Sequence, residues 1–114
     1  MAEFSRDPPI IPSGGGARAE FLIQKLAQSS RTVAAAESCT AGLVADFLAR
    51  VPGASRVFWG AFVCYTPQAK VKMLGLDEET LRVYGAVSRE TARAMARGAL
   101  ERSGADMAVS VTGL

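Results

Sequence analysis

The stretch V-A-A-A-E-S-C-T-A-G-L, at residues 33–43, decides the fold that the sequence predicts. It opens with small apolar residues, which suit a strand buried on both faces. A polar turn follows at 37–40, and the apolar spacing over 43–51 is that of an amphipathic helix. A helix N-terminus carries unpaired amides and partial positive charge, so this turn suits an anion or a developing oxyanion. The alternative is that Ser38 or Thr40 simply caps the helix.

The segments around this stretch alternate between strand and helix patterns. Strands are predicted at 32–36, 57–65 and 106–111, and helices at 17–28, 43–51, 67–74, 78–84 and 88–104. The run at 57–65 is aromatic, β-branched and too continuous to have a solvated face along its whole length. Strands that alternate with helices predict an α/β domain with a largely parallel sheet.

Local signals place the ends of the later helices. Thr66, Asp77 and Ser88 are predicted N-caps, and Pro67 suits the first helical position. The longest helix has a predicted buried stripe. The stripe consists of Ala92, Met95, Ala96, Ala99 and Leu100.

Composition narrows the classes of function. The 114 residues carry 13 basic and 11 acidic side chains, for a formal charge of +2 without a basic block, so nucleic-acid binding has no support. No apolar run approaches the roughly 18 residues of a membrane span, and there is no signal-peptide pattern. We therefore expect a cytoplasmic protein. Residues 1–16, rich in proline and glycine, are expected to be a disordered leader before a domain at 17–114.

The sequence contains no histidine. This excludes a Ser-His-Asp or Cys-His arrangement within the chain and removes the commonest nitrogen ligand for zinc. A nucleophile here must be activated by a lysine, a tyrosine, a carboxylate or a helix end. Cys39 and Cys64 lack CxxC spacing, and the sequence favours reduced, buried thiols for both.

Several polar residues follow the ends of predicted strands. Ligands of parallel sheets gather beyond the carboxyl ends of the strands. Ser38, Tyr65 with Lys70, and Thr112 with Gly113 each lie at or just beyond such an end. If the three strands are parallel, these residues share one site.

Ser38 could be a nucleophile without histidine. A lysine can replace the imidazole if desolvation or a nearby positive charge keeps it neutral. Lys70 lies one turn into a helix that begins at the end of an apolar strand, whereas Lys72 points elsewhere on that helix. Tyr65 could relay a proton or orient the substrate, and Thr40 with the amides after Ser38 could form an oxyanion hole. The ordinary alternative is a solvated lysine and a packed tyrosine ring.

Other assignments are weaker. Glu37 is a second candidate base, but adjacent residues of a strand face opposite sides, so it would point away from Ser38. Cys39 is an alternative nucleophile, since a helix N-terminus favours a thiolate. The phosphate-binding motifs GxxxxGK[ST] and GxGxxG are absent.

A series of motifs resembles one known family. The motifs are A-E-S-C-T-A-G-L at 36–43, V-P-G-A-S at 51–55, F-W-G-A-F-V-C-Y-T-P-Q-A-K at 58–70, Y-G-A-V-S at 84–88, A-R-A-M-A at 92–96 and G-A-D-M-A-V-S-V-T-G at 104–113. In their order and spacing they resemble the C-terminal domain of the competence/damage-inducible CinA proteins, whose members act as nicotinamide-nucleotide amidases. The resemblance covers about 19–114.

The resemblance implies a three-layer α/β/α sandwich and an amidohydrolase of pyridine-nucleotide salvage. The substrate would be nicotinamide mononucleotide, and the products nicotinate mononucleotide and ammonia, without a metal or cofactor. Ser38 would be the nucleophile, Lys70 its base and Tyr65 their support. The oxyanion and substrate would meet the turn formed by Cys39, Thr40, Ala41 and Gly42, and Thr112 with Gly113 would open the loop that holds the nucleotide.

The sequence departs from the family pattern in two places. Ala41 stands where the family commonly has glycine, and a methyl group there could crowd a backbone–ligand approach. Family members also continue beyond the T-G of 112–113, so we expect a domain without its last strand and helix elements. An exposed sheet edge would then favour a homo-oligomer. The alternative function is a catalytically impaired module that binds a nucleotide or a partner subunit without turnover.

Overall fold

The centre of the fold is a short strand of small residues, β1 (Val33–Glu37), every residue of which is buried. The computed structural model of the protein describes residues 15–113. The other elements are α1 (Gly15–Ser29), α2 (Leu43–Ala49), the 3-10 helix η1 (Ala54–Arg56), β2 (Phe58–Val63), α3 (Pro67–Leu74), α4 (Glu78–Tyr84), α5 (Arg89–Ser103) and β3 (Met107–Val111). The alanines of β1 allow helices to approach both faces of the sheet.

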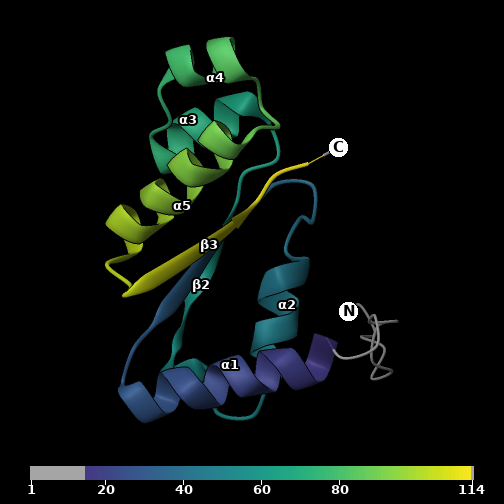
Figure 1. Ribbon diagram of the computed structural model, residues 1–114, viewed down its shortest axis with the longest axis vertical. Coiled ribbons are helices and arrows are strands. Elements are labelled where there is room, and N and C mark those ends of the chain that lie inside the picture. The colour runs from purple at the N-terminus through teal and green to yellow at the C-terminus, as the bar shows by residue number, and fades with distance from the viewer. Residues whose placement is uncertain (1–14, 114) are drawn as a thin grey trace, which may run out of the picture.

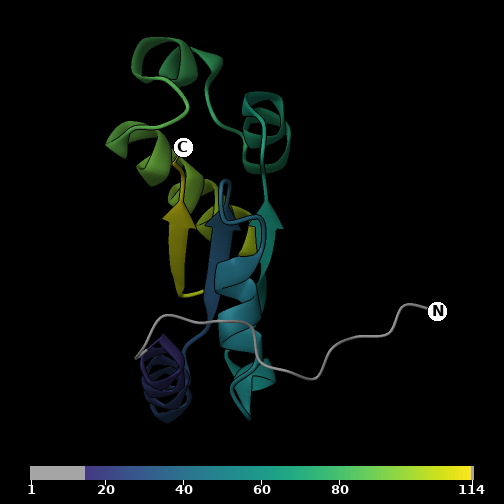
Figure 2. The same cartoon turned by 90° about the vertical axis from the view of Figure 1, so that its right-hand side faces the viewer.

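The three strands form one parallel sheet in the order β2-β1-β3. Figure 2 shows the three arrowheads pointing the same way, so the carboxyl ends of all strands lie at one edge. Glu37 at the end of β1 pairs with Val63 of β2 and with Val111 of β3. The parallel sheet expected from the sequence is therefore confirmed, and the segments that follow the strands begin side by side.

Helices cover both faces of the sheet, which confirms the predicted three-layer α/β/α sandwich (Figure 1). One hydrophobic core joins α1 and α2 to one face and includes Ile23, Leu26 and Leu48. The other core joins α3 and α5 to the opposite face and includes Leu74 and Met95. Together these cores fix the sheet and the helices that carry the candidate site.

The local signals at the helix ends are confirmed. The side chains of Thr66, Asp77 and Ser88 each accept a backbone N–H of the helix that they cap. Pro67 is the first residue of α3. The first helix, α1, begins at Gly15, two residues before the start predicted at residue 17. The rest of the predicted leader lies outside the described residues.

The strand predicted at 57–65 is present as β2, which is shorter, and neither of its faces is solvated along its whole length. Within it, Trp59 is 50% exposed and Val63 is 42% exposed. Strand order is the reason, because β2 has a neighbour on only one side among the described residues. The register also shifts between Val33 and Ala34 of the partner strand, opposite Gly60 with its φ of 148°.

The predicted stripe of α5 is largely correct. Met95 and Ala99 are buried, and Ala92 and Ala96 are half-buried. Leu100 is exposed, contrary to expectation. The described residues contain no helix long and apolar enough to cross a membrane.

Candidate active site

Ser38 and Lys70 meet at the carboxyl end of the sheet. The Nζ of Lys70 donates hydrogen bonds to the Oγ of Ser38 at 3.0 Å and to the carbonyl oxygen of Cys64 at 3.3 Å. The Ser38 hydroxyl in turn donates to the carbonyl oxygen of Tyr65 at 3.3 Å. Ser38 is 5% exposed and Lys70 is 1% exposed. The two side chains that the sequence linked as nucleophile and base are therefore in contact.

The start of α3 places Lys70. Thr66 caps the helix by accepting the amide of Ala69 at 3.0 Å. One turn later, Lys70 lies on the same buried face of α3 as Leu74. Lys72, two residues on, is exposed. The contrast predicted between the two lysines is confirmed.

No carboxylate pairs with Lys70 among the described residues. The ion pairs in this part of the chain, Arg50 with Asp46 and Arg82 with Glu79, both lie on the surface. The polar partners of the Lys70 nitrogen are a hydroxyl and a carbonyl oxygen. An amine in such surroundings can exchange a proton with the Ser38 hydroxyl without competition from an acid.

Glu37 caps α2 from the preceding strand. Its carboxylate accepts the Thr40 hydroxyl at 2.7 Å and the amides of Gly42, Val44 and Ala45 at 3.1, 2.9 and 2.9 Å. Burial alone raises the pKa of the Glu37 carboxyl. The hydrogen bonds from Thr40 and from the three amides outweigh burial, and the pKa falls below its ordinary value.

This arrangement corrects two expectations about the turn. Neither Ser38 nor Thr40 caps α2, because Gly42 occupies the N-cap position and provides no side-chain hydrogen bond. The Thr40 hydroxyl is bound to Glu37, so only its backbone amide remains for an oxyanion. Ala41 and Gly42 both have positive φ, 50° and 108°, which carries the chain from the strand into the helix.

The end of β3 lies against the same turn. The Ser38 amide donates to the Val111 carbonyl at 3.0 Å. The Thr112 hydroxyl donates to the Ala86 carbonyl at 2.7 Å, away from Ser38. A Cβ on Gly113 would lie 3.2 Å from the Sγ of Cys39. The structure therefore brings residues 112–113 beside the Ser38 turn, as the parallel sheet predicted.

The cysteines differ from each other. Cys64 is buried, as expected, and its thiol lies 3.8 Å from the sulfur of Met73. Burial raises the pKa of the Cys64 thiol, and the nearby Lys70 charge offsets only part of that rise. Cys39 is exposed, contrary to the expectation of a buried thiol, because it lies at the outer part of the turn. Its thiol has no hydrogen-bond partner among the described residues.

Tyr65 contacts the pair through its backbone. Tyr65 is 66% exposed as a residue, and its carbonyl oxygen accepts the Ser38 hydroxyl. The predicted role of the phenol in proton relay or substrate orientation stays a prediction.

Sequence reasoning missed the role of the segment between α4 and α5. Thr91, fully buried in the first turn of α5, donates its hydroxyl to the Gly85 carbonyl at 2.6 Å. The neighbouring Ala86 carbonyl holds Thr112. The signal in the sequence was the Y-G-A-V-S motif, whose glycine has a φ of 79°. This segment supports the site at the end of β3.

Comparison with known proteins agrees with the fold and the motifs. The family model for the CinA C-terminal domain matches residues 16–114. The chain belongs to the CinA family. Its sequence is 49% identical to a CinA-like protein of Chlorobium limicola over 105 residues, which is 92% of this chain and 24% of that protein. The chain spans about a fifth to a quarter of the length of the curated CinA relatives it matches, 21% and 24% in two of them.

Solved structures of the CinA superfamily share the fold. The competence/damage inducible protein CihA from Agrobacterium tumefaciens is 45% identical, with a TM-score of 0.90 over 94% of this chain and 65% of that one. A CinA superfamily protein from Escherichia coli is 33% identical, with a TM-score of 0.86 over 93% of this chain and 62% of that one.

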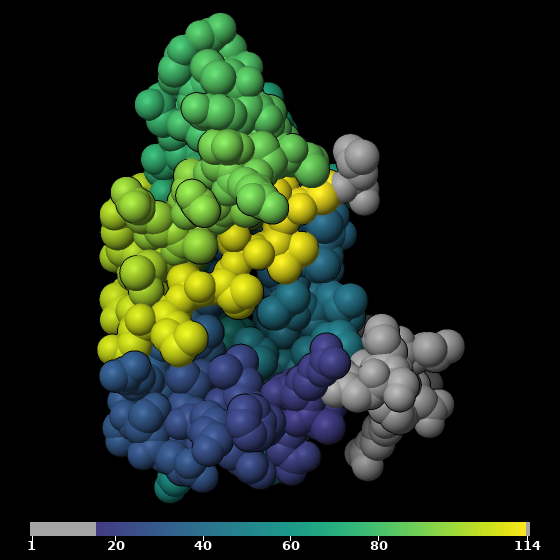
Figure 3. Space-filling model, in the orientation of Figure 1, coloured from purple at the N-terminus to yellow at the C-terminus, as the bar shows by residue number. Residues whose placement is uncertain are grey.

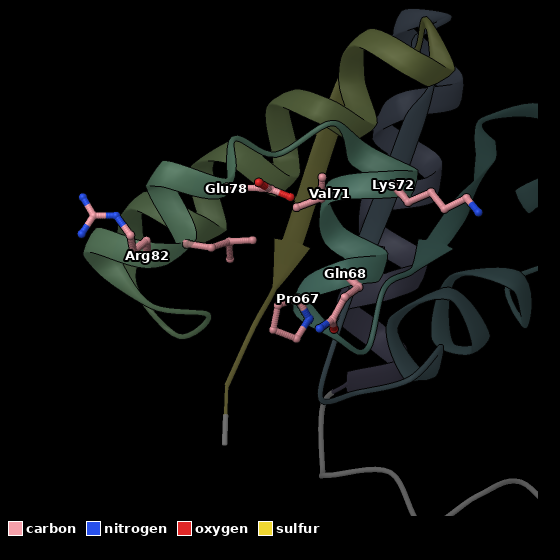
Figure 4. A pocket seen from close by; sticks show the side chains of 7 residues that line it. Pro67, Gln68, Val71, Lys72, Glu78 and Arg82 are labelled. Carbon is pink, nitrogen blue, oxygen red and sulfur yellow. The ribbon is translucent and has the colours of Figure 1, made fainter.

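A hollow of this CinA domain lies away from Ser38. It has a volume of about 450 Å³ and lies between α3 and α4 (Figure 4). Pro67 and Val71 line it from α3, and Glu78 and Leu81 from α4. Lys70 is not part of its wall and is buried on another side of α3. Within residues 15–113, no three His, Cys, Asp or Glu side chains are grouped as a metal site requires.

Proposed function

We propose that this chain is a nicotinamide-nucleotide amidase domain. It would hydrolyse the carboxamide of nicotinamide mononucleotide to give nicotinate mononucleotide and ammonia in pyridine-nucleotide salvage. The observation that supports this most strongly is the hydrogen bond of 3.0 Å between the buried side chains of Lys70 and Ser38. A serine and a lysine suffice for acyl transfer when no histidine is present.

In the first half of the reaction, Ser38 forms an ester with the substrate. Its Oγ attacks the carboxamide carbon, and its proton moves to the Nζ of Lys70, which acts as the general base. The tetrahedral intermediate then collapses, the C–N bond breaks, and Lys70 returns the proton to the departing nitrogen as ammonia leaves. The Tyr65 carbonyl, which now holds the Ser38 hydroxyl, keeps the Oγ close to the amine during this exchange.

In the second half, water cleaves the ester. Lys70 removes a proton from water as the hydroxide attacks the acyl carbon, and the proton then passes to Ser38 when the ester bond breaks. Nicotinate mononucleotide leaves, and the serine and the amine are regenerated. The two half-reactions proposed here require only Ser38, Lys70, the substrate and water.

The remaining site residues would hold the substrate. Thr112 and Gly113 lie beside the turn that follows Ser38, where they would open the nucleotide loop. The exposed ring of Tyr65 would orient the pyridine at the entrance. The Thr112 hydroxyl is bound to the Ala86 carbonyl, so residue 112 would act mainly through its backbone.

Product analysis tests this proposal. Incubation of the chain with nicotinamide mononucleotide should give ammonia and nicotinate mononucleotide in equal amounts. Ser38→Ala should reduce the rate by about 10³-fold or more, since it removes the group that forms the intermediate. Calorimetric binding of the nucleotide without any turnover would instead favour the non-catalytic module. Loss of activity in Cys39→Ala but not in Ser38→Ala would favour the cysteine nucleophile.

We also propose that the domain forms a homo-oligomer. Met107 and Val109 of β3 are exposed, at 44% and 41%, on the sheet face that α1 and α2 leave partly uncovered. Figure 3 shows β3 at the surface between α5 and α2. Sedimentation should give an oligomer at micromolar concentration, and a monomer there would contradict this proposal.

A further inference from the structure

The turn after Ser38 contains two backbone amides that donate no hydrogen bond within the described part of the chain. From residue 38 to residue 46, every amide except those of Cys39 and Thr40 donates to an acceptor in the described part of the chain. Both exceptions directly follow the nucleophile in sequence. Amides in this position can stabilise negative charge on a carbonyl oxygen under attack by the preceding serine.

Glu37 determines which amides remain available. The start of α2 offers no donor to a ligand, because the carboxylate already accepts the amides of Gly42, Val44 and Ala45. The same carboxylate accepts the Thr40 hydroxyl, which directs that side chain toward the interior. What remains for a ligand is the outer part of the turn, at residues 39–40.

Glu37 acts from the opposite face of the sheet to Ser38. Consecutive residues of a strand point to opposite faces. Accordingly, Ser38 meets Lys70 of α3 on one face, while Glu37 meets the start of α2 on the other. Glu37 is fully buried, so a shift of its carboxylate would move the turn that connects it to the nucleophile.

The geometry points to Glu37 as the positioning residue of the amidase reaction, because its carboxylate holds the 38–42 turn with the Cys39 and Thr40 amides free for the oxyanion. This inference rests on the proposed function. Glu37 does not touch the reacting atoms, and it acts through the backbone of the turn. It therefore affects the transition state more than substrate binding.

The side chain at residue 37 must be a carboxylate, because each group that it binds is a hydrogen-bond donor. One carboxylate oxygen accepts from Thr40, Gly42 and Val44, and the other accepts from Ala45. In Glu37→Gln an NH₂ group would face one of these donors, since an amide has a single acceptor oxygen. The turn must then open on one side although the side chain keeps its size.

The test compares Glu37→Gln with the wild-type chain in ammonia release from nicotinamide mononucleotide. We expect kcat to fall about 10²-fold, the cost of weakening an oxyanion hole, with KM changed less than about threefold. A pyridine-3-carbaldehyde mononucleotide, which can form a hemiacetal with Ser38, should lose affinity in parallel with kcat/KM. Asp46→Asn, which alters a carboxylate of α2 paired with Arg50, should leave both quantities unchanged.

The outcomes separate this inference from the proposed function. If the folded wild-type chain releases no ammonia, the amidase function is wrong. If the wild type is active and the folded Glu37→Gln variant keeps the wild-type kcat, whether or not its KM rises, the positioning role is wrong. Should Glu37→Gln fail to fold, Thr40→Val decides, since it removes only the hydroxyl that the carboxylate accepts. A fall in kcat of about tenfold at unchanged KM would then support the role, and an unchanged kcat would overturn it.

Discussion

The Nζ of Lys70 lies 3.0 Å from the Oγ of Ser38, although 32 residues separate them in the sequence. The contact depends on two structural features. The parallel pairing of β1 and β2 brings the end of each strand to the same edge, and the cap at Thr66 starts α3 there. We therefore expect the position of Lys70 to depend on helix packing and capping as well as on its contact with Ser38.

Close packing of α5 against α3 should be essential for the position of Lys70. A Cβ on Gly98 would lie 2.3 Å from the Leu74 carbonyl oxygen, so Gly98→Ala must push the two helices apart. We expect a loss of about 1–3 kcal/mol in the free energy of unfolding and a lower rate of ammonia release. Gly16→Ala is the control, since α1 has open space there. Urea unfolding should show that variant unchanged or up to about 1 kcal/mol more stable.

Acid should destabilise the domain partly through Glu37. Its pKa in the folded state lies below the ordinary value of 4.5, so the folded state favours the carboxylate. This stability is fully present above about pH 4.5 and is lost as the pH falls through the lower, folded-state pKa. The unfolding free energy should thus fall more steeply between about pH 5 and pH 3 in the wild type than in Glu37→Gln. Equal slopes in the wild type and in Glu37→Gln would refute the prediction.

Replacing Ala41 by glycine should stabilise the protein. Ala41 has a φ of 50°, a left-handed conformation that costs a residue with a Cβ about 1–2 kcal/mol. Glycine avoids that strain but loses more backbone entropy on folding, so we expect a net gain of about 0.5–1 kcal/mol. Thermal and urea unfolding would measure it. Ala45→Gly, inside α2, should instead lose about 1 kcal/mol, and a similar loss in Ala41→Gly would contradict the observed turn.

The two thiols should differ in reactivity. Cys39 is exposed, whereas Cys64 is buried and its pKa is raised by that burial. Iodoacetamide added to the native protein should therefore modify Cys39 and spare Cys64, as peptide mass spectrometry would show. Both should react in urea. Modification of Cys64 in the native state at a comparable rate would mean that its surroundings open readily.

The sequence predicted the features that depend on neighbours in the chain. Thr66 and Ser88 were recognisable as caps because a cap binds amides only a few residues ahead. The contact between Ser38 and Lys70 could be predicted only under the assumption of a parallel sheet, which the pairing of β1 with β2 confirms. The cap at Thr66 and this one topological rule were enough to place the candidate nucleophile and base.

Features that depend on distant parts of the chain were not predictable in the same way. The exposure of Trp59 follows from the position of β2 at the edge of the sheet, and hydrophobicity does not specify strand order. The cap of α2 was assigned to the wrong residue, because Glu37 reaches it from the preceding strand past Gly42. The bond from Thr112 to Ala86 joins segments 26 residues apart, and no local pattern in the sequence pairs these two segments.

The most direct test of the account is ammonia release from nicotinamide mononucleotide by the wild-type chain, Lys70→Met and Lys72→Met. Methionine has a similar length to lysine but cannot accept a proton. We expect Lys70→Met to lower kcat by about 10²–10⁴-fold, the contribution of a general base, and Lys72→Met to match the wild type. If a folded Lys70→Met variant releases ammonia at the wild-type rate, the Ser38–Lys70 pair is not the catalytic machinery.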